Sequence, residues 1–303
     1  VRIAQILNTD SAIVKLVKDT SGMFEVDHLN VISLKSGRWI DAKSPLRYEI
    51  ELKCNGYRKR FELVKDDFIR NKIIAHRGSW KEHGVSQNSI GSLKAGIALG
   101  CEAIEFDVWY TSDNELILSH DPVIGDKHIE ETPAEEILQV ELLQGETVPR
   151  LKEYIDIIKS QNKSHLVLEI KVSEKGKERN MELAEAVVRN IHQEKAQAWV
   201  EYISFSYDIL MKIRELDNTA RLRYLENNRS IQEIKSANLS GIDYHYAHFF
   251  QDSLLIKHAK ESGLSTNAWT VNDKYDMDRL IEMGIDYITT DEPAIALEKV
   301  KNE

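Results

Sequence analysis

Near residue 72 the pattern of this 303-residue sequence changes. Beyond that point, short apolar runs rich in β-branched residues alternate with segments in which apolar residues recur every three or four positions. This alternation predicts strands joined by helices, and eight repeats favour an α/β fold in the form of a closed (β/α)8 TIM barrel. An open doubly wound sheet is the alternative, but the G-x-G-x-x-G loop expected after its first strand is absent. The expected barrel strands are residues 73–75, 103–108, 166–170, 202–205, 222–225, 241–244, 265–269 and 286–290.

The first 70 residues follow a different pattern. Between residues 46 and 64, apolar and charged residues alternate on both sides of Asn55-Gly56, a dipeptide typical of a two-residue hairpin turn. Residues 12–17 and 29–34 indicate further short strands. We therefore expect a small, accessory, β-sandwich-like antiparallel domain over residues 1–70, followed by the barrel over residues 71–303. The small domain has no cluster of catalytic residue types, so we expect it to pack against or dock another protein.

One strand-like run does not fit the strand–helix rhythm. Residues 116–120 follow the second barrel strand after only seven residues, Trp109 to Glu115, which include the turn sequence Thr111-Ser112-Asp113-Asn114. A parallel crossover needs about a dozen residues or more, so this run is expected to fold back antiparallel on the second strand. That arrangement would bring His120 close to Asp107 at the mouth of the barrel.

Composition excludes several kinds of partner. The net charge of -10 makes the chain a poor non-specific binder of nucleic acid or of anionic membranes. No run approaches the roughly 20 apolar residues of a membrane span, so stable membrane insertion is not expected. Cys54 and Cys101 give neither a disulfide framework nor a zinc pattern. The chain begins with Val; if an export signal has been removed, a periplasmic or cell-surface location is favoured, and otherwise a cytoplasmic one.

Three carboxylates are expected to converge at the carboxyl ends of neighbouring strands. Glu105 and Asp107 are two residues apart on the second strand and therefore point to the same side, and Glu169 lies on the next barrel strand. Three carboxylates in an apolar barrel need compensating charge. Because all the ligands are oxygen atoms, one hard divalent cation, Mg²⁺ or Ca²⁺, is the expected cofactor. A purely structural network with Arg77 and Lys171 is the alternative.

The two histidines and two cations beside this cluster suggest its chemistry. His76 and His120 can act as general acid and general base near neutral pH. The guanidinium of Arg77 has a planar fork suited to a phosphate, and Lys171 adds a point charge. The sequence does not indicate which histidine is the acid and which the base.

Six short motifs follow one another along the second region: His76-Arg77-Gly78, Glu105-Phe106-Asp107-Val108, His120-Asp121, Glu169-Ile170-Lys171, Trp269-Thr270-Val271-Asn272 and Thr290-Asp291-Glu292-Pro293. In order and spacing they resemble the motifs of the glycerophosphodiester phosphodiesterase family. The resemblance covers residues 73–296 and implies a phospholipase-C-like phosphodiesterase barrel.

The resemblance also implies an activity in lipid metabolism: metal-dependent hydrolysis of glycerophosphodiesters to glycerol 3-phosphate and an alcohol. It implies that Arg77 and Lys171 contact the phosphate and that Trp269 lines the pocket. It further implies roles for the remaining matched residues, with His76 and His120 as acid–base catalysts and Glu105, Asp107 and Glu169 as metal ligands.

One position departs from the family pattern. Where the family usually has Pro-Glu-Asn-Thr, this chain has Ser86-Gln87-Asn88-Ser89, so Gln87 stands in place of a glutamate. The change removes one negative charge near the expected metal site, so we expect a lower affinity for the cation.

Two other functions are compatible with the sequence. A related lipid phosphodiesterase or lyase could use the same barrel, but no exposed apolar or basic run is available for docking on a bilayer. A non-catalytic phosphodiester-binding protein is the second alternative. The presence of both His76 and His120 argues against it, because binding alone does not need a paired acid and base.

Overall fold

The computed structural model describes residues 2–6 and 12–301. These residues form two compact units, which divide between Asp67 and Phe68. The N-terminal unit contains two three-stranded antiparallel sheets, one in the order β1-β4-β3 and the other in the order β2-β5-β6. Apolar residues from both sheets share one core, in which Phe24 and Tyr48 meet edge to face at 5.3 Å. The strands are β1 (Arg2–Gln5), β2 (Lys15–Asp19), β3 (Phe24–Val26), β4 (Val31–Leu34), β5 (Arg47–Cys54) and β6 (Tyr57–Val64).

The β5–β6 hairpin has the predicted turn, because Asn55 and Gly56 both adopt positive φ angles, 48° and 86°. The strand expected over residues 12–17 begins only at Lys15. The backbone before it is held by a side chain: Asn30 accepts from the Val14 amide at 2.8 Å and donates to the Ala12 carbonyl at 3.0 Å. These bonds replace the strand partners that the pattern had suggested.

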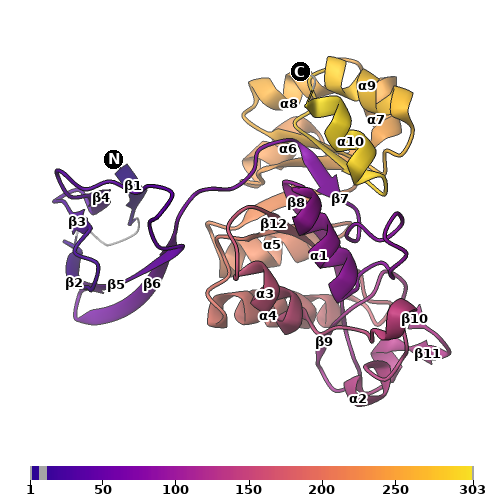
Figure 1. The fold of residues 1–303 in the computed structure, drawn as a ribbon, viewed down its shortest axis with the longest axis horizontal. Helices are drawn as coiled ribbons and strands as arrows, with labels where there is room; N and C mark the ends of the chain where they lie inside the picture. Colours follow the sequence, from indigo (N-terminus) through magenta and orange to yellow (C-terminus); the bar gives the residue numbers. More distant parts are fainter. Residues whose placement is uncertain (1, 7–11, 302–303) are drawn as a thin grey trace. The chain divides into compact units, whose positions relative to one another are not determined.

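The second unit is the predicted barrel. Its parallel strands are hydrogen-bonded in the order β12-β13-β14-β15-β16-β17-β7-β8, and pairing of β12 with β8 closes the ring. Figure 1 shows helices packed around these strands. The strands are β7 (Ile73–Ala75), β8 (Ala103–Tyr110), β12 (His165–Ile170), β13 (Val200–Ser204), β14 (Arg221–Tyr224), β15 (Gly241–His245), β16 (Ser265–Trp269) and β17 (Tyr287–Thr290).

The fold-back after the second strand is confirmed. Strand β9 (Leu116–Leu118) pairs antiparallel with β8. A long connection then leads to α3 and covers the apolar residues beneath it, including Trp109 and Ile117. This connection contains β10 (Val123–Ile124), β11 (Lys127–His128), the 3-10 turns η1 (Ile129–Glu131) and η2 (Leu143–Gly145), and α2 (Ala134–Ile137).

The helices follow the predicted periodicity. Helix α1 ends where Gly100 takes a left-handed conformation, with φ of 82°. In the part of the chain that the structure describes, no helix is both long and apolar enough to cross a membrane. The remaining bounds are α1 (Ile90–Leu99), α3 (Leu151–Ile158), α4 (Lys177–Gln193), α5 (Tyr207–Leu216), α6 (Ile231–Ser236), α7 (Tyr246–Gln251), α8 (Leu255–Glu261), α9 (Lys274–Glu282) and α10 (Pro293–Val300).

Candidate active site

The three carboxylates converge at the carboxyl ends of neighbouring strands. Asp107 on β8 lies in register with Glu169 on β12, and Glu105 is two residues earlier on β8. Their exposed fractions are 3% for Glu105, 0% for Asp107 and 8% for Glu169. One ligand oxygen from each lies within 4.8 Å of the others, and no further group of this kind occurs among the described residues. The set can therefore surround one small cation with oxygen atoms.

The charges of this cluster are unequally compensated. Burial, then repulsion from Asp107 and Glu169, raises the pKa of Glu105 well above its usual value. Burial and the Asp107 charge raise the pKa of Glu169 to about 7. Burial would also raise the pKa of Asp107, but Lys171, His120 and Arg77 hold it below its usual value. Without a further positive charge, burial and mutual repulsion therefore disfavour ionisation of Glu105 and Glu169.

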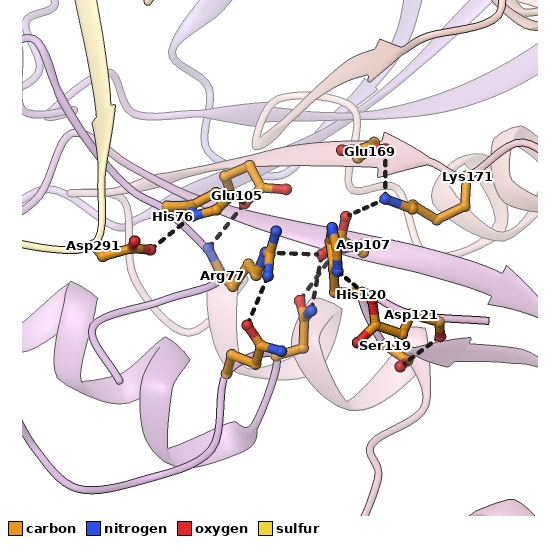
Figure 2. A network of polar contacts seen from close by, with 12 residues as sticks. His76, Arg77, Glu105, Asp107, Ser119, His120, Asp121, Glu169, Lys171 and Asp291 are labelled. Atoms are coloured by element: carbon orange, nitrogen blue, oxygen red, sulfur yellow. Dashed lines mark hydrogen bonds and ion pairs between the residues drawn. The ribbon is translucent and has the colours of Figure 1, made fainter. Parts of the chain in front are cut away.

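Lys171 and Arg77 supply part of the compensation. Nζ of Lys171 lies 2.9 Å from Glu169 and 3.3 Å from Asp107, and Nε of Arg77 lies 3.7 Å from Asp107 (Figure 2). The ion pairs expected of a purely structural network with Arg77 and Lys171 are thus present. They leave a negative excess, because two cations face three carboxylates. Oδ1 of Asp107 is buried and accepts no hydrogen bond, although Lys171 lies 3.3 Å from it, so this oxygen can still accept a further ligand. The donor set therefore fits a divalent cation.

Each of the two histidines is held by an aspartate. Nδ1 of His76 lies 2.7 Å from Asp291, and Nδ1 of His120 lies 2.8 Å from Asp121 (Figure 2). An aspartate that accepts from Nδ1 fixes the ring and leaves Nε2 available for proton transfer. Burial lowers the pKa of His120, and the Asp107 charge offsets this only in part.

The sequence did not predict a role for these two aspartates, although both stand in the motifs His120-Asp121 and Thr290-Asp291-Glu292-Pro293. Asp121 immediately follows His120, so proximity in the sequence could have suggested the pair. Asp291 is 215 residues from His76, and the contact arises only because β17 lies beside β7 in the closed barrel. Asn272 also binds Asp291, at 2.8 Å, and so fixes the carboxylate that holds His76.

The loop after β7 has a strained backbone conformation, which directs the Arg77 amide toward the carboxylate cluster. Arg77 has a φ of 54°, and its amide donates to Glu105 at 2.8 Å. The next residue is glycine for a steric reason: at a φ of 85°, a Cβ on Gly78 would lie 2.4 Å from Oγ of Ser92 in α1. The close contact between this loop and α1 thus fixes the Arg77 backbone.

Gln87 and Asn88 lie on the same side of the cluster. Oε1 of Gln87 accepts from Nη1 of Arg77 at 2.8 Å. The Asn88 side chain donates to Asp107 at 2.9 Å and accepts from the Asp107 amide at 3.1 Å. A role for Asn88 was not predicted from the sequence, although it stands next to Gln87. The guanidinium of Arg77 therefore lies between Gln87 and Asp107 and contacts both side chains.

All the predicted site residues except Asp107 line one pocket of about 460 Å³, which includes its open mouth. Asp107 lies behind Lys171 and Arg77, which do line it. The histidines and most charged lining residues lie on or just after β7, β8, β9 and β12, whereas the apolar ones lie on or just after β13, β14 and β16. Trp269 packs edge to face on Phe205 at 5.5 Å. The full lining is His76, Arg77, Glu105, His120, Glu169, Lys171, Ile203, Phe205, Leu225, Asp243, Trp269, Thr270 and Thr289.

The two histidines of this pocket can transfer protons, and Arg77 and Lys171 can neutralise a bound anion. The cleavage of a phosphate ester requires both. Fold and site together define a barrel hydrolase of the phosphodiesterase class. The chain belongs to the glycerophosphoryl diester phosphodiesterase family, whose model matches residues 76–295. The N-terminal unit lies outside this match.

Individual relatives agree with the family assignment. The chain is 27% identical to a glycerophosphodiester phosphodiesterase of Caldanaerobacter subterraneus, over 77% of this chain and 99% of the relative. A crystal structure of a glycerophosphodiester phosphodiesterase from Parabacteroides distasonis superposes with a TM-score of 0.74 at 35% identity, over 78% of this chain and 98% of the other. A phosphodiesterase of Oleispira antarctica, solved in complex with the product sn-glycerol-3-phosphate, superposes with a TM-score of 0.69 at 26% identity, over 77% and 97%.

Proposed function

We propose that this protein hydrolyses glycerophosphodiesters to sn-glycerol 3-phosphate and an alcohol, with help from one divalent cation. The observation that carries the proposal is the pairing of two aspartate-bound histidines with three buried carboxylates around one pocket. Membership of the family and the product bound to the Oleispira antarctica relative support the choice of substrate.

Each group of the chain has a part in this reaction. Arg77 and Lys171 balance the charge that develops on the phosphoryl oxygens. One histidine takes a proton from the attacking oxygen, and the other protonates the leaving alkoxide. Asp291 and Asp121 keep the two rings in place for these transfers.

Glu105, Asp107 and Glu169 would hold the cation. Their oxygen-only donor set favours Mg²⁺ or Ca²⁺ over softer metals. A cation bound there supplies Lewis-acid stabilisation of a phosphoryl oxygen. It would also supply the positive charge that Lys171 and Arg77 alone do not provide.

The proposal is tested by incubating the full chain with glycerophosphocholine, glycerophosphoethanolamine and glycerophosphoglycerol in the presence of Mg²⁺ or Ca²⁺. Release of sn-glycerol 3-phosphate is followed with a coupled dehydrogenase. Turnover of at least one of these diesters supports the proposal, and release of phosphocholine or a cyclic phosphate as the end product would contradict it.

Cation binding is expected to release protons near neutral pH. The pKa of Glu169 is raised to about 7 when no cation is present, so this carboxyl is partly protonated there and must ionise to become a ligand. Calorimetric titration of Mg²⁺ in buffers of different ionisation enthalpy measures the number of protons. This number should fall as the pH rises above 7 and Glu169 is already ionised. A proton count of zero from pH 6 to 8 would contradict this account.

Replacing Gln87 by glutamate is expected to tighten cation binding by roughly tenfold, because a new negative charge lies one guanidinium away from Asp107. The same change should weaken inhibition by inorganic phosphate, because the new carboxylate would engage Arg77. Both constants can be measured by calorimetry, with Gln251→Glu at the exposed end of α7 as the control. An unchanged cation dissociation constant would show that position 87 does not sense the cation.

A further inference from the structure

A second cavity lies outside the active pocket, between the turn after β8, the first residues of α3 and one face of α4. Its volume is about 610 Å³, which includes its open mouth. One wall is formed by Tyr110, the last residue of β8, and Leu116, the first residue of β9, which pair with each other across the turn. None of the described residues that line this cavity also lines the active pocket, so the two are separate.

The wall that α4 contributes combines space with polar groups. Ala186, Arg189, Asn190 and Gln193 are spaced three and four residues apart and therefore lie on one face of the helix. The small side chain of Ala186 leaves room beside the longer ones. Burial raises the pKa of Tyr110, and the charges of Arg179 and Arg189 offset this in part, so Arg189 lies close to the opposite wall.

The guanidinium of Arg189 has no partner of its own. An arginine on a helix usually pairs with an acidic residue one turn away, and Glu185 stands in that position. The Glu185 carboxylate is bound instead to Nζ of Lys212, at 2.8 Å. No described residue makes a hydrogen bond or a close ion pair with the Arg189 guanidinium. Its N–H groups are therefore available to a ligand.

Of the two other cations that line the cavity, only one can contribute to binding. Nε of Arg150 lies 3.8 Å from Glu115, a distance too long for a hydrogen bond. Lys152 is already neutralised by Asp156 at 3.0 Å and Glu194 at 3.4 Å. Two guanidinium groups thus face one space, and their planar forks suit the oxygen atoms of a phosphate.

A second feature of the cavity calls for a hydroxyl group. Oδ1 of Asn190 is buried and has no hydrogen-bond partner among the described residues. A buried polar atom of this kind often marks a place where a ligand or water completes the bonding. A fully ionised phosphate can only accept hydrogen bonds, so it cannot satisfy this oxygen, whereas a hydroxyl can. The ligand that fits both features carries a phosphate and at least one free hydroxyl.

We propose that this cavity binds a small phosphorylated polyol, with its phosphate between Arg189 and Arg150 and a hydroxyl on Asn190. The smallest ligand of this class is sn-glycerol 3-phosphate. The inference concerns a site outside the active pocket and does not depend on the proposed hydrolysis. The ligand would contact the ends of the same two strands that carry Asp107 and lead to His120.

The test follows the Nε–H signals of the arginine side chains in the ¹⁵N-labelled full chain by nuclear magnetic resonance. The Arg189 signal is identified by its absence from the spectrum of Arg189→Gln. Titration with sn-glycerol 3-phosphate should move this signal until it saturates, with a dissociation constant below about 1 mM. Sodium chloride at the same ionic strength should not move it. The signal of Arg279, an exposed arginine of α9, is the control and should stay in place.

A second titration separates the phosphate from the hydroxyl. Inorganic phosphate should move the Arg189 signal as well, but it should bind about tenfold more weakly, since the hydrogen bond to Asn190 is missing. Asn190→Leu keeps the size of the side chain and should abolish this difference while leaving the affinity for inorganic phosphate unchanged. Should Asn190→Leu fail to fold, the ratio of the two wild-type dissociation constants decides the role of the hydroxyl.

Three results would overturn the inference: an Arg189 signal that moves no further than in chloride, equal affinities of the wild type for the two ligands, or a preference that survives in folded Asn190→Leu. The Arg77 signal reports the active pocket in the same spectra, so binding there is not mistaken for binding in the second cavity. Turnover of glycerophosphoethanolamine is measured separately and decides only the proposed hydrolysis.

Discussion

Replacing His120 by alanine should lower turnover of a glycerophosphodiester by roughly 10²-fold or more, the usual contribution of a positioned proton-transfer group. The side chain of His120 lines the pocket, and Asp121 holds its Nδ1 so that Nε2 can transfer a proton. The thermal midpoint should change little, because a partly exposed ring at the pocket mouth contributes little to the core. Steady-state kinetics at saturating cation, together with a melting curve, measure both effects.

The matched control is His192→Ala. His192 is likewise bound to an aspartate, Asp217 at 2.8 Å, but it stands at the end of α4, outside the pocket. Its loss should leave turnover within about twofold of wild type, with a modest loss of stability. If His120→Ala keeps near wild-type turnover at saturating cation, the acid–base assignment is wrong.

The second large effect is expected from Glu169→Gln. The change keeps the shape of the side chain but removes the charge of one of the three proposed cation ligands, and with it the ion pair with Lys171 at 2.9 Å. Cation affinity and turnover should fall together, each by roughly 10²-fold, since one charged ligand of a small hard cation is lost. In the wild type, Mg²⁺ or Ca²⁺ should raise the melting temperature by mass action, and this rise should nearly vanish in the variant.

A control variant at a buried glutamate outside the site distinguishes the effect of losing a cation ligand from the effect of losing a buried charge. Glu130 is 1% exposed and is bound to Ser173 and Arg179. Glu130→Gln should lower the melting temperature but leave the cation-induced rise intact. Normal cation binding by Glu169→Gln would mean that the three carboxylates are structural.

The barrel could be predicted because the sequence patterns that indicate its strands and helices are local. Each strand shows a short apolar run, and each helix repeats its apolar residues every three or four positions. The antiparallel position of β9 followed from the length of one connection, and it correctly placed His120 beside Asp107. The convergence of Glu105 and Glu169 followed from the rule that the active sites of such barrels lie at the carboxyl ends of the strands.

The contacts that complete the site were not predictable, because they join parts of the chain that are far apart in sequence. Asp291 meets His76 only through the closure of the barrel, and Asn267 links Asp243 to Thr289 across three strands. Asp243 also stands in a run that the pattern alone marks as a plain interior strand. In the N-terminal unit, β1 and β3 were not predicted because each has only two apolar residues, whereas β4, of similar length, has three.

The rate of sn-glycerol 3-phosphate release from glycerophosphoethanolamine, before and after removal of bound metal, tests the central claim most directly. The wild-type full chain is treated with a chelator, dialysed into metal-free buffer, and assayed with and without added Mg²⁺ or Ca²⁺. We expect the stripped protein to remain folded by circular dichroism, to release no product above background, and to recover its activity when the cation is restored, with no recovery in Glu169→Gln. Release of sn-glycerol 3-phosphate at the full rate by the metal-free protein would contradict the account.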